Sequence, residues 1–213
     1  MDPLVKKNEL GARIAEAGFN LFRQYGVRAI TLDEIALQLG ISKKTIYEHF
    51  TGKNELVTEI IRQRISQIQD QFLAMTARSG DAIEANMLMI QFLNGIFRNM
   101  NPIVLMDLQK YHPEGYRIYH EHMYGFVLEA MRKNITRGIA EGLYRADTNI
   151  EIMAYYRVES CNMCFKPGMF PKDHFEMSRV QKELLEHFIF GIATEKGYKL
   201  MMEYREKILN KKD

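Results

Sequence analysis

The stretch that decides the fold is residues 31–53, TLDEIALQLGISKKTIYEHFTGK. Thr31, followed three residues later by Glu34, has the pattern of a capping box and predicts that a helix begins here. Gly40 comes just after the last apolar residue of that helix and can end it in a left-handed conformation. Ser42 is the candidate N-cap of a second short helix. Two short helices joined by a turn of about three residues are predicted, which is the spacing of a helix-turn-helix.

The rest of the chain also reads as a succession of helices. Residues 7–25 place apolar side chains at helical spacing, and capping residues recur along the chain, where Thr148 with Glu151 and Asp173 with Glu176 predict the starts of two late helices. Only 14 glycines and 5 prolines occur among 213 residues, so turns are few, and no alternating pattern of strand length is found. The sequence predicts an all-α protein: a three-helix N-terminal helix-turn-helix domain over residues 1–56, then a larger helical bundle over residues 57–213, with about nine to ten helices in total.

The composition excludes several classes of protein. Hydrophobic residues make up 46% and charged residues 26% of the chain, which is ordinary for a globular protein and excludes a wholly disordered one. Two cysteines cannot build a disulfide scaffold and favour a reducing compartment. The start, MDPLVKKNEL, has no apolar stretch of signal-peptide length, and no segment approaches the ~18 apolar residues of a membrane span. We therefore expect a cytoplasmic protein with no membrane association.

The charge balance is nearly neutral. The formal net charge is +2, and residues 1–60 hold 8 basic and 8 acidic side chains. Net charge alone therefore does not indicate nucleic-acid binding. A local excess of basic residues exists within residues 41–54, and we expect only a modest salt dependence for any binding to DNA.

A longer run around the opening stretch carries a family resemblance. Residues 15–57, AEAGFNLFRQYGVRAITLDEIALQLGISKKTIYEHFTGKNELV, resemble the N-terminal DNA-binding domain of the TetR family of bacterial transcriptional regulators. The positions that carry the resemblance are Leu21, Phe22, Gly26, Thr31, Ile35, Ala36, Thr45, Ile46, Tyr47, His49, Phe50, Lys53, Glu55 and Leu56. Beyond them the likeness rests on length, helicity and a late set, Gly191, Ile192, Thr194, Gly197 and Tyr204.

The resemblance implies a set of DNA contacts, and the residue types agree with it. Lys43, Lys44 and Thr45 lie in the first turn of the second short helix, from which side chains reach base edges in the major groove. Side chains farther along, and those at the starts of neighbouring helices, can bind phosphate oxygens. The candidate DNA-binding residues are Thr31, Ser42, Lys43, Lys44, Thr45, Tyr47, His49 and Lys53.

Two late helices are apolar on more than one side. A helix that is buried on two sides needs a second partner, and a second copy of the chain would supply it through a four-helix interface. The resemblance also implies a homodimer formed by a pair of late helices, which suits a palindromic site on double-stranded DNA. The candidate interface residues are Ile150, Ala154, Val158, Cys161, Leu184 and Phe188.

The middle of the chain is rich in methionine and aromatic residues. Methionine adapts its shape and suits both irregular cores and adaptable pockets, so core packing remains an alternative for each residue. The resemblance implies that this region encloses a cavity for a small effector, which the lining suggests is lipophilic or aromatic. The candidate pocket residues are Met89, Phe92, Met106, Tyr119, Met123 and Phe126.

The sequence does not support an enzyme. It contains no G-x-S-x-G, no phosphate-binding loop and no dinucleotide-binding glycine pattern, and Asp107, Glu114 and Glu121 are interpreted as solvated carboxylates. Cys161 and Cys164 form a C-x-x-C pair, but they lie at the end of a predicted helix without a second ligand pair. Packing is therefore favoured over a redox or zinc role. We expect no cofactor and no metal.

The functional prediction is a transcriptional repressor that a small lipophilic or aromatic effector releases from a palindromic operator. The alternative keeps the fold and the DNA binding but places the bundle under the control of a protein partner. The loop over residues 165–172, which carries Met169 and Phe170, is the candidate contact in that case. Both alternatives stay open at this point.

Overall fold

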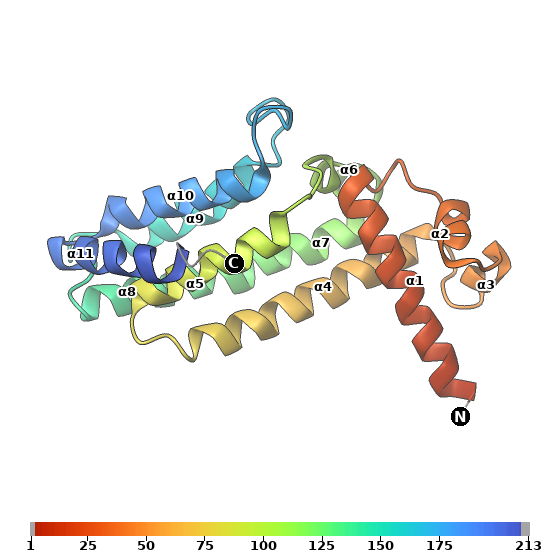
Figure 1. The fold of residues 1–213 in the computed structure, drawn as a ribbon, viewed down its shortest axis with the longest axis horizontal. Helices are drawn as coiled ribbons and strands as arrows, with labels where there is room; N and C mark the ends of the chain where they lie inside the picture. Colours follow the sequence, from red (N-terminus) through yellow and green to blue (C-terminus); the bar gives the residue numbers. More distant parts are fainter. Residues whose placement is uncertain (1–2, 210–213) are drawn as a thin grey trace. The chain divides into compact units, whose positions relative to one another are not determined.

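The computed structural model describes residues 3–209, and the elements within that range are all helical (Figure 1). The predicted all-α fold is confirmed. Because η1 joins α7 to α8 and η2 continues α11, the described elements form ten uninterrupted helical stretches. They are α1 (Pro3–Tyr25), α2 (Leu32–Leu39), α3 (Lys43–Tyr47), α4 (Lys53–Thr76), α5 (Ala82–Phe97), α6 (Ile103–Tyr111), α7 (Pro113–Glu121), the π-helix η1 (His122–Val127), α8 (Leu128–Ala140), α9 (Ile150–Met163), α10 (Met177–Ile192), α11 (Glu195–Tyr204) and the π-helix η2 (Arg205–Leu209).

The chain divides into two compact units. The first comprises Met1–Gln67 and Asn99–His120, and the second comprises Ile68–Arg98 and Glu121–Asp213. The helices α6 and α7 therefore group with the N-terminal helices, although they lie far from them in sequence. The functional division expected between residues 56 and 57 stays a prediction, and the ends of its two ranges, residues 1–2 and 210–213, lie outside the described residues.

The first unit has an aliphatic and aromatic core. Ile14 and Phe22 from α1, Ile35 from α2, Ile46 from α3 and Leu56 from α4 are buried in one cluster. Each comes from the apolar stripe of its helix, and burying a large aliphatic or aromatic side chain contributes roughly 1.5–3 kcal/mol. Three buried side chains of α2, Leu32, Ile35 and Ala36, and one of α3, Ile46, therefore dock these short helices against the longer ones.

The second unit is built around α5. This helix packs against α8, α10 and α11, and α9 packs against both α8 and α10. Met87 and Ile90 of α5 are buried, as are Val158 of α9 and Leu185 and Phe188 of α10. Seven residues of α5 are buried, namely Ala82, Ile83, Ala85, Asn86, Met87, Met89 and Ile90, which fits its central place, since a helix that is buried on several sides must be covered by several partners.

The chain turns sharply after α8 and passes close to that helix. The backbone N–H groups of Leu143 and Tyr144 both donate to the Gly138 carbonyl, at 2.8 and 3.0 Å. A Cβ atom on Gly138 would lie 2.1 Å from Cδ2 of the Tyr144 ring. Glycine at 138 is therefore required for the tyrosine ring to lie across the helix, where it is fully buried.

Two predicted helix starts are wrong by a few residues. Thr148 does not cap α9; the side chain of Asn149 does, accepting from the N–H of Ile152 at 3.0 Å. The start expected at Asp173 is displaced to Met177. The reason is that residues 171–175 form tight turns, with the N–H groups of residues 174 and 175 both bonded to the Pro171 carbonyl.

Candidate nucleic-acid interface and ligand pocket

The helix-turn-helix is held by side-chain caps at each start. Thr31 Oγ1 accepts from the N–H of Glu34 at 3.2 Å, and the Glu34 carboxylate accepts from the N–H of Thr31 at 2.6 Å. This is the predicted capping box. Gly40 has φ +64° and ends α2 in the left-handed region, which glycine adopts without steric cost. Ser42 Oγ then accepts from the N–H of Thr45 at 3.1 Å and begins α3.

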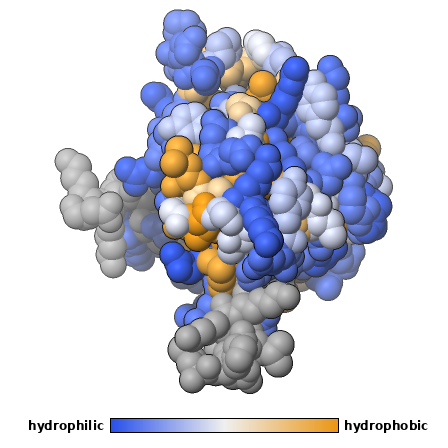
Figure 2. Space-filling model, turned by 90° about the vertical axis from the view of Figure 1, so that its right-hand side faces the viewer, coloured by the Kyte–Doolittle hydropathy of each residue, from blue (hydrophilic) through white to orange (hydrophobic). Residues whose placement is uncertain are grey.

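The short helix α3 is anchored by one residue and exposes the rest. Ile46 is completely buried, whereas Lys43, Lys44 and Tyr47 are exposed, and Tyr47 has 50% of its surface accessible. Thr45 and His49, two further candidate residues, are half-buried. Figure 2 views the side that carries α1, α2 and α3, where the surface is mostly hydrophilic with a few hydrophobic side chains. This surface can therefore meet a polar partner without losing core packing.

The two lysines of the first turn differ in their surroundings. Lys43 Nζ lies 2.7 Å from Asp33 Oδ2, and this hydrogen bond, together with the carboxylate charge, raises the pKa of Lys43 above its ordinary value. Within residues 3–209 no ion pair or hydrogen bond is found for the Lys44 side chain. Lys44 is thus the cation of α3 that can meet a phosphate or a base without first breaking a contact.

Among the candidate DNA-binding residues, Lys53 is the one whose surroundings suit a DNA contact least well. It is half-buried at the start of α4, its Nζ lies 3.4 Å from the Arg28 carbonyl oxygen, and it lies over the Phe22 ring at 5.9 Å. Burial lowers the pKa of Lys53. The side chain is therefore engaged within its own unit, and contact with a phosphate would have to compete with the Arg28 carbonyl.

A buried carboxylate that the sequence analysis misjudged lies beside this lysine. Asp107 of α6 is only 3% exposed, so its interpretation as a solvated carboxylate is wrong. Asp107 Oδ2 accepts from the backbone N–H of Arg28 at 2.8 Å. The Arg28 residue is thus held at its N–H by Asp107 and at its carbonyl by Lys53. No local pattern indicates this contact, because Asp107 and Arg28 are 79 residues apart.

The second unit contains a pocket with a volume of about 380 Å³. It lies between α4, α5, η1 and α8, and it is lined by Phe72, Leu73, Thr76, Ala85, Asn86, Met89, Gly125, Phe126, Glu129, Ala130, Met131, Lys133, Asn134 and Arg137. Small-molecule sites span roughly 300–1,000 Å³, so the size suits a small ligand.

Of the six predicted pocket residues, two line this pocket and four do not. Met89 and Phe126 line the pocket. Phe92 and Met123 lie in the same unit but are not part of the lining. Met106 and Tyr119 belong to the first unit and do not line this pocket, and their role in effector binding stays a prediction. A methionine-rich composition does not say which helices pack together.

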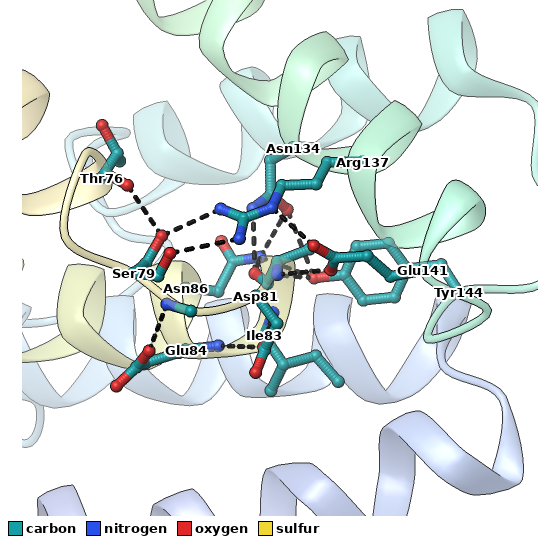
Figure 3. Close-up of polar contacts among 12 residues, drawn as sticks. Thr76, Ser79, Asp81, Ile83, Glu84, Asn86, Asn134, Arg137, Glu141 and Tyr144 are labelled. Atoms are coloured by element: carbon teal, nitrogen blue, oxygen red, sulfur yellow. Dashed lines mark hydrogen bonds and ion pairs between the residues drawn. The ribbon is translucent and has the colours of Figure 1, made fainter.

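A buried polar network adjoins the pocket (Figure 3). Asn86 Nδ2 donates to Asn134 Oδ1 at 2.7 Å and to the Tyr144 hydroxyl at 2.9 Å, and Asn134 Nδ2 donates to the Ala82 carbonyl at 2.9 Å. Burial raises the pKa of Tyr144 above its ordinary range, so the hydroxyl keeps its proton. These side chains come from α5, α8 and the turn after α8, and they tie these three segments together.

The predicted dimer residues lie mostly in the core. Ala154, Val158 and Phe188 are buried within the single chain, so their assignment to a surface between two chains is wrong. Ile150, Cys161 and Leu184 are partly exposed and stay predictions. The apolar side chains that α9 does expose are Ile152, Tyr155 and Tyr156. The helix has apolar residues on two sides, and the periodicity alone does not say which side faces inward.

The second unit also contains the cysteine pair. Cys161 and Cys164 are free thiols. Cys164 is buried, accepts from Gln181 Nε2 at 2.9 Å, and burial raises the pKa of its thiol to about 12. In the described range no group of three or more His, Cys, Asp or Glu residues is placed to hold a metal ion. None of the helices described has the length and apolar content needed to cross a membrane.

Comparisons with known proteins find a family model that matches the N-terminal region and relatives that are similar over most of the chain. Residues 14–60 match the family described as bacterial regulatory proteins, tetR family. The HTH-type transcriptional repressor KstR2 of Mycobacterium tuberculosis is 23% identical over 156 residues, which cover 68% of this chain and 74% of that protein. The uncharacterized HTH-type transcriptional regulator YvaF of Bacillus subtilis is 23% identical over 191 residues, 86% of this chain and 95% of that one.

A solved structure agrees in fold. The TetR-family transcriptional regulator from Agrobacterium tumefaciens has a TM-score of 0.73 and 14% sequence identity, and the likeness covers 88% of this chain and 100% of that chain. At this identity the likeness is one of fold.

Proposed function

Since the chain belongs, through its N-terminal domain, to the TetR family of bacterial regulatory proteins, we propose that this DNA-binding transcriptional regulator is a homodimeric repressor that a small molecule releases from a palindromic operator. Regulators of this family bind DNA and are not enzymes. We propose a cytoplasmic location, because the operator DNA lies there.

The observation that carries this proposal is the exposed first turn of α3. Ser42 fixes where the helix starts, Ile46 fixes how it docks, and Lys44 and Tyr47 are left exposed. A recognition helix presents its N-terminal residues to base edges in the major groove. Lysine can donate to guanine, and the tyrosine hydroxyl can donate to a phosphate oxygen.

The dimer proposal rests on the exposed apolar residues of α9. Ile152, Tyr155 and Tyr156 expose between 41% and 65% of their surfaces in the single chain. An isologous interface uses the same residues on both copies, so one apolar helix face suffices to form it. Replacing Tyr155 with Asp should convert the dimer to a monomer in analytical ultracentrifugation, and an unchanged sedimentation coefficient would contradict this interface.

Selection of bound duplexes from a random DNA library tests the operator proposal. The full chain is used at about 150 mM salt, because non-specific affinity falls steeply with salt. Recovery of two inverted half-sites separated by a multiple of about one helical turn supports a dimer on a palindrome. Recovery of no enriched sequence overturns the proposal.

Two matched variants test whether the side chains of α3 are needed to select the site. The double variant Lys44→Ala/Tyr47→Ala should lose the enriched site, whereas Lys110→Ala, which removes an exposed lysine of α6 in the same unit, should keep it. The recovered site, placed before a reporter promoter, then tests the mode of regulation. Lower expression in the presence of the protein supports repression, and higher expression overturns it.

A further inference from the structure

The pocket of the second unit has one apolar and uncharged side. Phe72 of α4 meets Phe126 of η1 edge to face, with ring centroids 5.4 Å apart, and Met89 and Met131 add flexible apolar surface. Behind Phe126, His122 is stacked on its ring at 5.6 Å. Burial lowers the pKa of His122 to about 4, so this side of the pocket carries no charge at neutral pH. It suits the hydrocarbon body of a ligand.

The opposite end of the pocket is polar, and Asn134 and Arg137 keep unused hydrogen-bond donors there. Asn134 Nδ2 donates to the Ala82 carbonyl, which leaves one of its two N–H groups. Arg137 donates from Nε to Glu141 and from its two terminal nitrogens to Ser79. Because a guanidinium has five N–H groups, two remain. Asn134 Oδ1 already accepts from Asn86.

Among the residues that line this end, basic side chains outnumber acidic ones. Lys133 and Arg137 line the pocket together with one carboxylate, Glu129, whereas the Glu141 carboxylate that pairs with Arg137 at 2.7 Å is not part of the lining. Glu129 is itself shared between Arg132 and Lys133, at 3.7 and 3.8 Å. A ligand ammonium would add a donor and a positive charge where both are already in excess. A ligand carboxylate accepts only, and it matches both the spare N–H groups and the charge.

We propose that the pocket binds an apolar carboxylic acid, with its hydrocarbon body against Phe72, Phe126 and Met89 and its carboxylate at Asn134, Arg137 and Lys133. This inference rests on the proposed effector control and specifies the chemical class of the effector. The π-helix η1 supplies Gly125 and Phe126 to the lining, and such segments are frequent at functional sites.

Three probes that share one body and differ in the head group test the class. Dodecanoate, 1-dodecanol and dodecylammonium are titrated separately into the full chain without DNA, below their aggregation limits, by isothermal titration calorimetry. Dodecanoate should bind at least about tenfold more tightly than the other two. Equal affinities, tighter binding of dodecylammonium, or no binding of dodecanoate overturns the proposal.

Two variants separate the head from the body of the ligand. Lys133→Gln should weaken dodecanoate about fivefold or more and leave 1-dodecanol unchanged. Its control is Lys199→Gln on α11, because Lys133 and Lys199 are similarly exposed, 76% and 70%, and each faces a glutamate on the preceding turn of its helix. Phe126→Leu should weaken all three probes alike. An equal loss of dodecanoate binding in both lysine variants overturns the assignment of the carboxylate end.

Release from DNA is measured separately. Dodecanoate is titrated into the complex of the protein with its selected operator, and the fraction of bound DNA is followed by fluorescence anisotropy. Carboxylate binding without DNA release supports the ligand class and overturns effector control. DNA release by all three probes alike supports effector control and overturns the ligand class.

Discussion

The helix-turn-helix of the first unit and the polar network around Asn86 in the second unit differ in the range over which their polar groups are bonded. In the helix-turn-helix, Thr31 bonds to Glu34 and Ser42 to Thr45, three residues apart and in contact with water. In the second unit, the buried Asn86 bonds to Asn134 and to the buried Tyr144, which are 48 and 58 residues away. The first arrangement sets helix ends and leaves side chains free for a partner. The second arrangement holds helices together.

This difference predicts which substitutions should weaken binding to a partner and which should lower the stability of the fold. Changing an exposed side chain of α3 removes a group that a partner can use but leaves few protein contacts broken. Changing a buried member of the Asn86 network leaves its former partners unsatisfied, and each such group costs about 1–3 kcal/mol. Outside the helix-turn-helix, the first unit also has bonds that are long in sequence, such as those of Asp107 with Arg28 and of Asn101 with Arg23.

The largest expected effect is in the buried network. Asn86→Ala leaves Asn134 Oδ1 and the Tyr144 hydroxyl without the amide that now donates to them, so the free energy of unfolding should fall by about 4 kcal/mol. Urea denaturation followed by circular dichroism measures it. Asn94→Ala on the same helix is the control, because Asn94 is exposed. Equal losses in the two variants would contradict a buried network.

The next effect is a pH dependence in the second unit. Burial lowers the pKa of His122 from 6.5 to about 4, so the unfolded chain binds this proton at a higher pH than the folded chain. The contribution is fully present above about pH 6.5 and is lost as the pH falls toward 4. Between about pH 7 and about pH 5 the free energy of unfolding should fall by about 2 kcal/mol through this residue.

The variant His122→Gln isolates that contribution. Without the titrating ring, the loss of stability between the same two pH values should be smaller by about 2 kcal/mol. A residual dependence is expected from His112 in the first unit, whose pKa burial also lowers. Urea denaturation at both pH values gives the comparison, and equal losses in the variant and the parent protein would rule out His122 as the source.

The third effect should appear in DNA affinity and not in stability. Lys44→Ala removes the unpaired cation of α3 and should weaken binding to the selected operator about tenfold. Lys43→Ala should weaken it less, because Asp33 already holds that ammonium. Fluorescence anisotropy measures both affinities, and thermal denaturation should give nearly the same melting temperature for each variant. A larger loss from Lys43→Ala would refute the distinction between the two lysines.

The smallest effect concerns a single cap. Thr31→Ala removes the oxygen that accepts from the N–H of Glu34, which should lower the free energy of unfolding by about 1 kcal/mol. Thr31→Ser keeps a hydroxyl at the same position and should restore most of that loss. Chemical denaturation of the full chain resolves the two variants. If serine fails to rescue, the threonine acts through something other than its cap.

The parts that the sequence predicted well are those with local causes. The capping box at Thr31, the left-handed Gly40 and the cap at Ser42 each depend on residues within one turn, and all three are confirmed. The all-helical class follows from periodicity, which is also local. The eight candidate DNA contacts stay predictions, with Lys53 bonded within its own unit.

The parts that the sequence missed depend on partners far along the chain. Asp107 looked like a surface carboxylate because nothing near it reveals its bond to Arg28. The apolar stripe through Ala154 and Val158 was assigned to a partner chain, although it faces the core. Amphipathicity says that a face is buried, but not by which helix. The same reason explains why Met106, which lies in the first unit, was grouped with Met89 and Phe126, which line the pocket of the second unit.

The crossing of Tyr144 over Gly138 has a consequence for finding relatives of this protein. A side chain at 138 would overlap the ring, and a smaller residue at 144 would leave Asn86 without its hydroxyl partner. The two positions can therefore change only together. Across diverged chains we expect them to covary, since residues in contact do so. A glycine six residues before a tyrosine at this turn would then serve as a search fingerprint for the buried network where overall identity has faded.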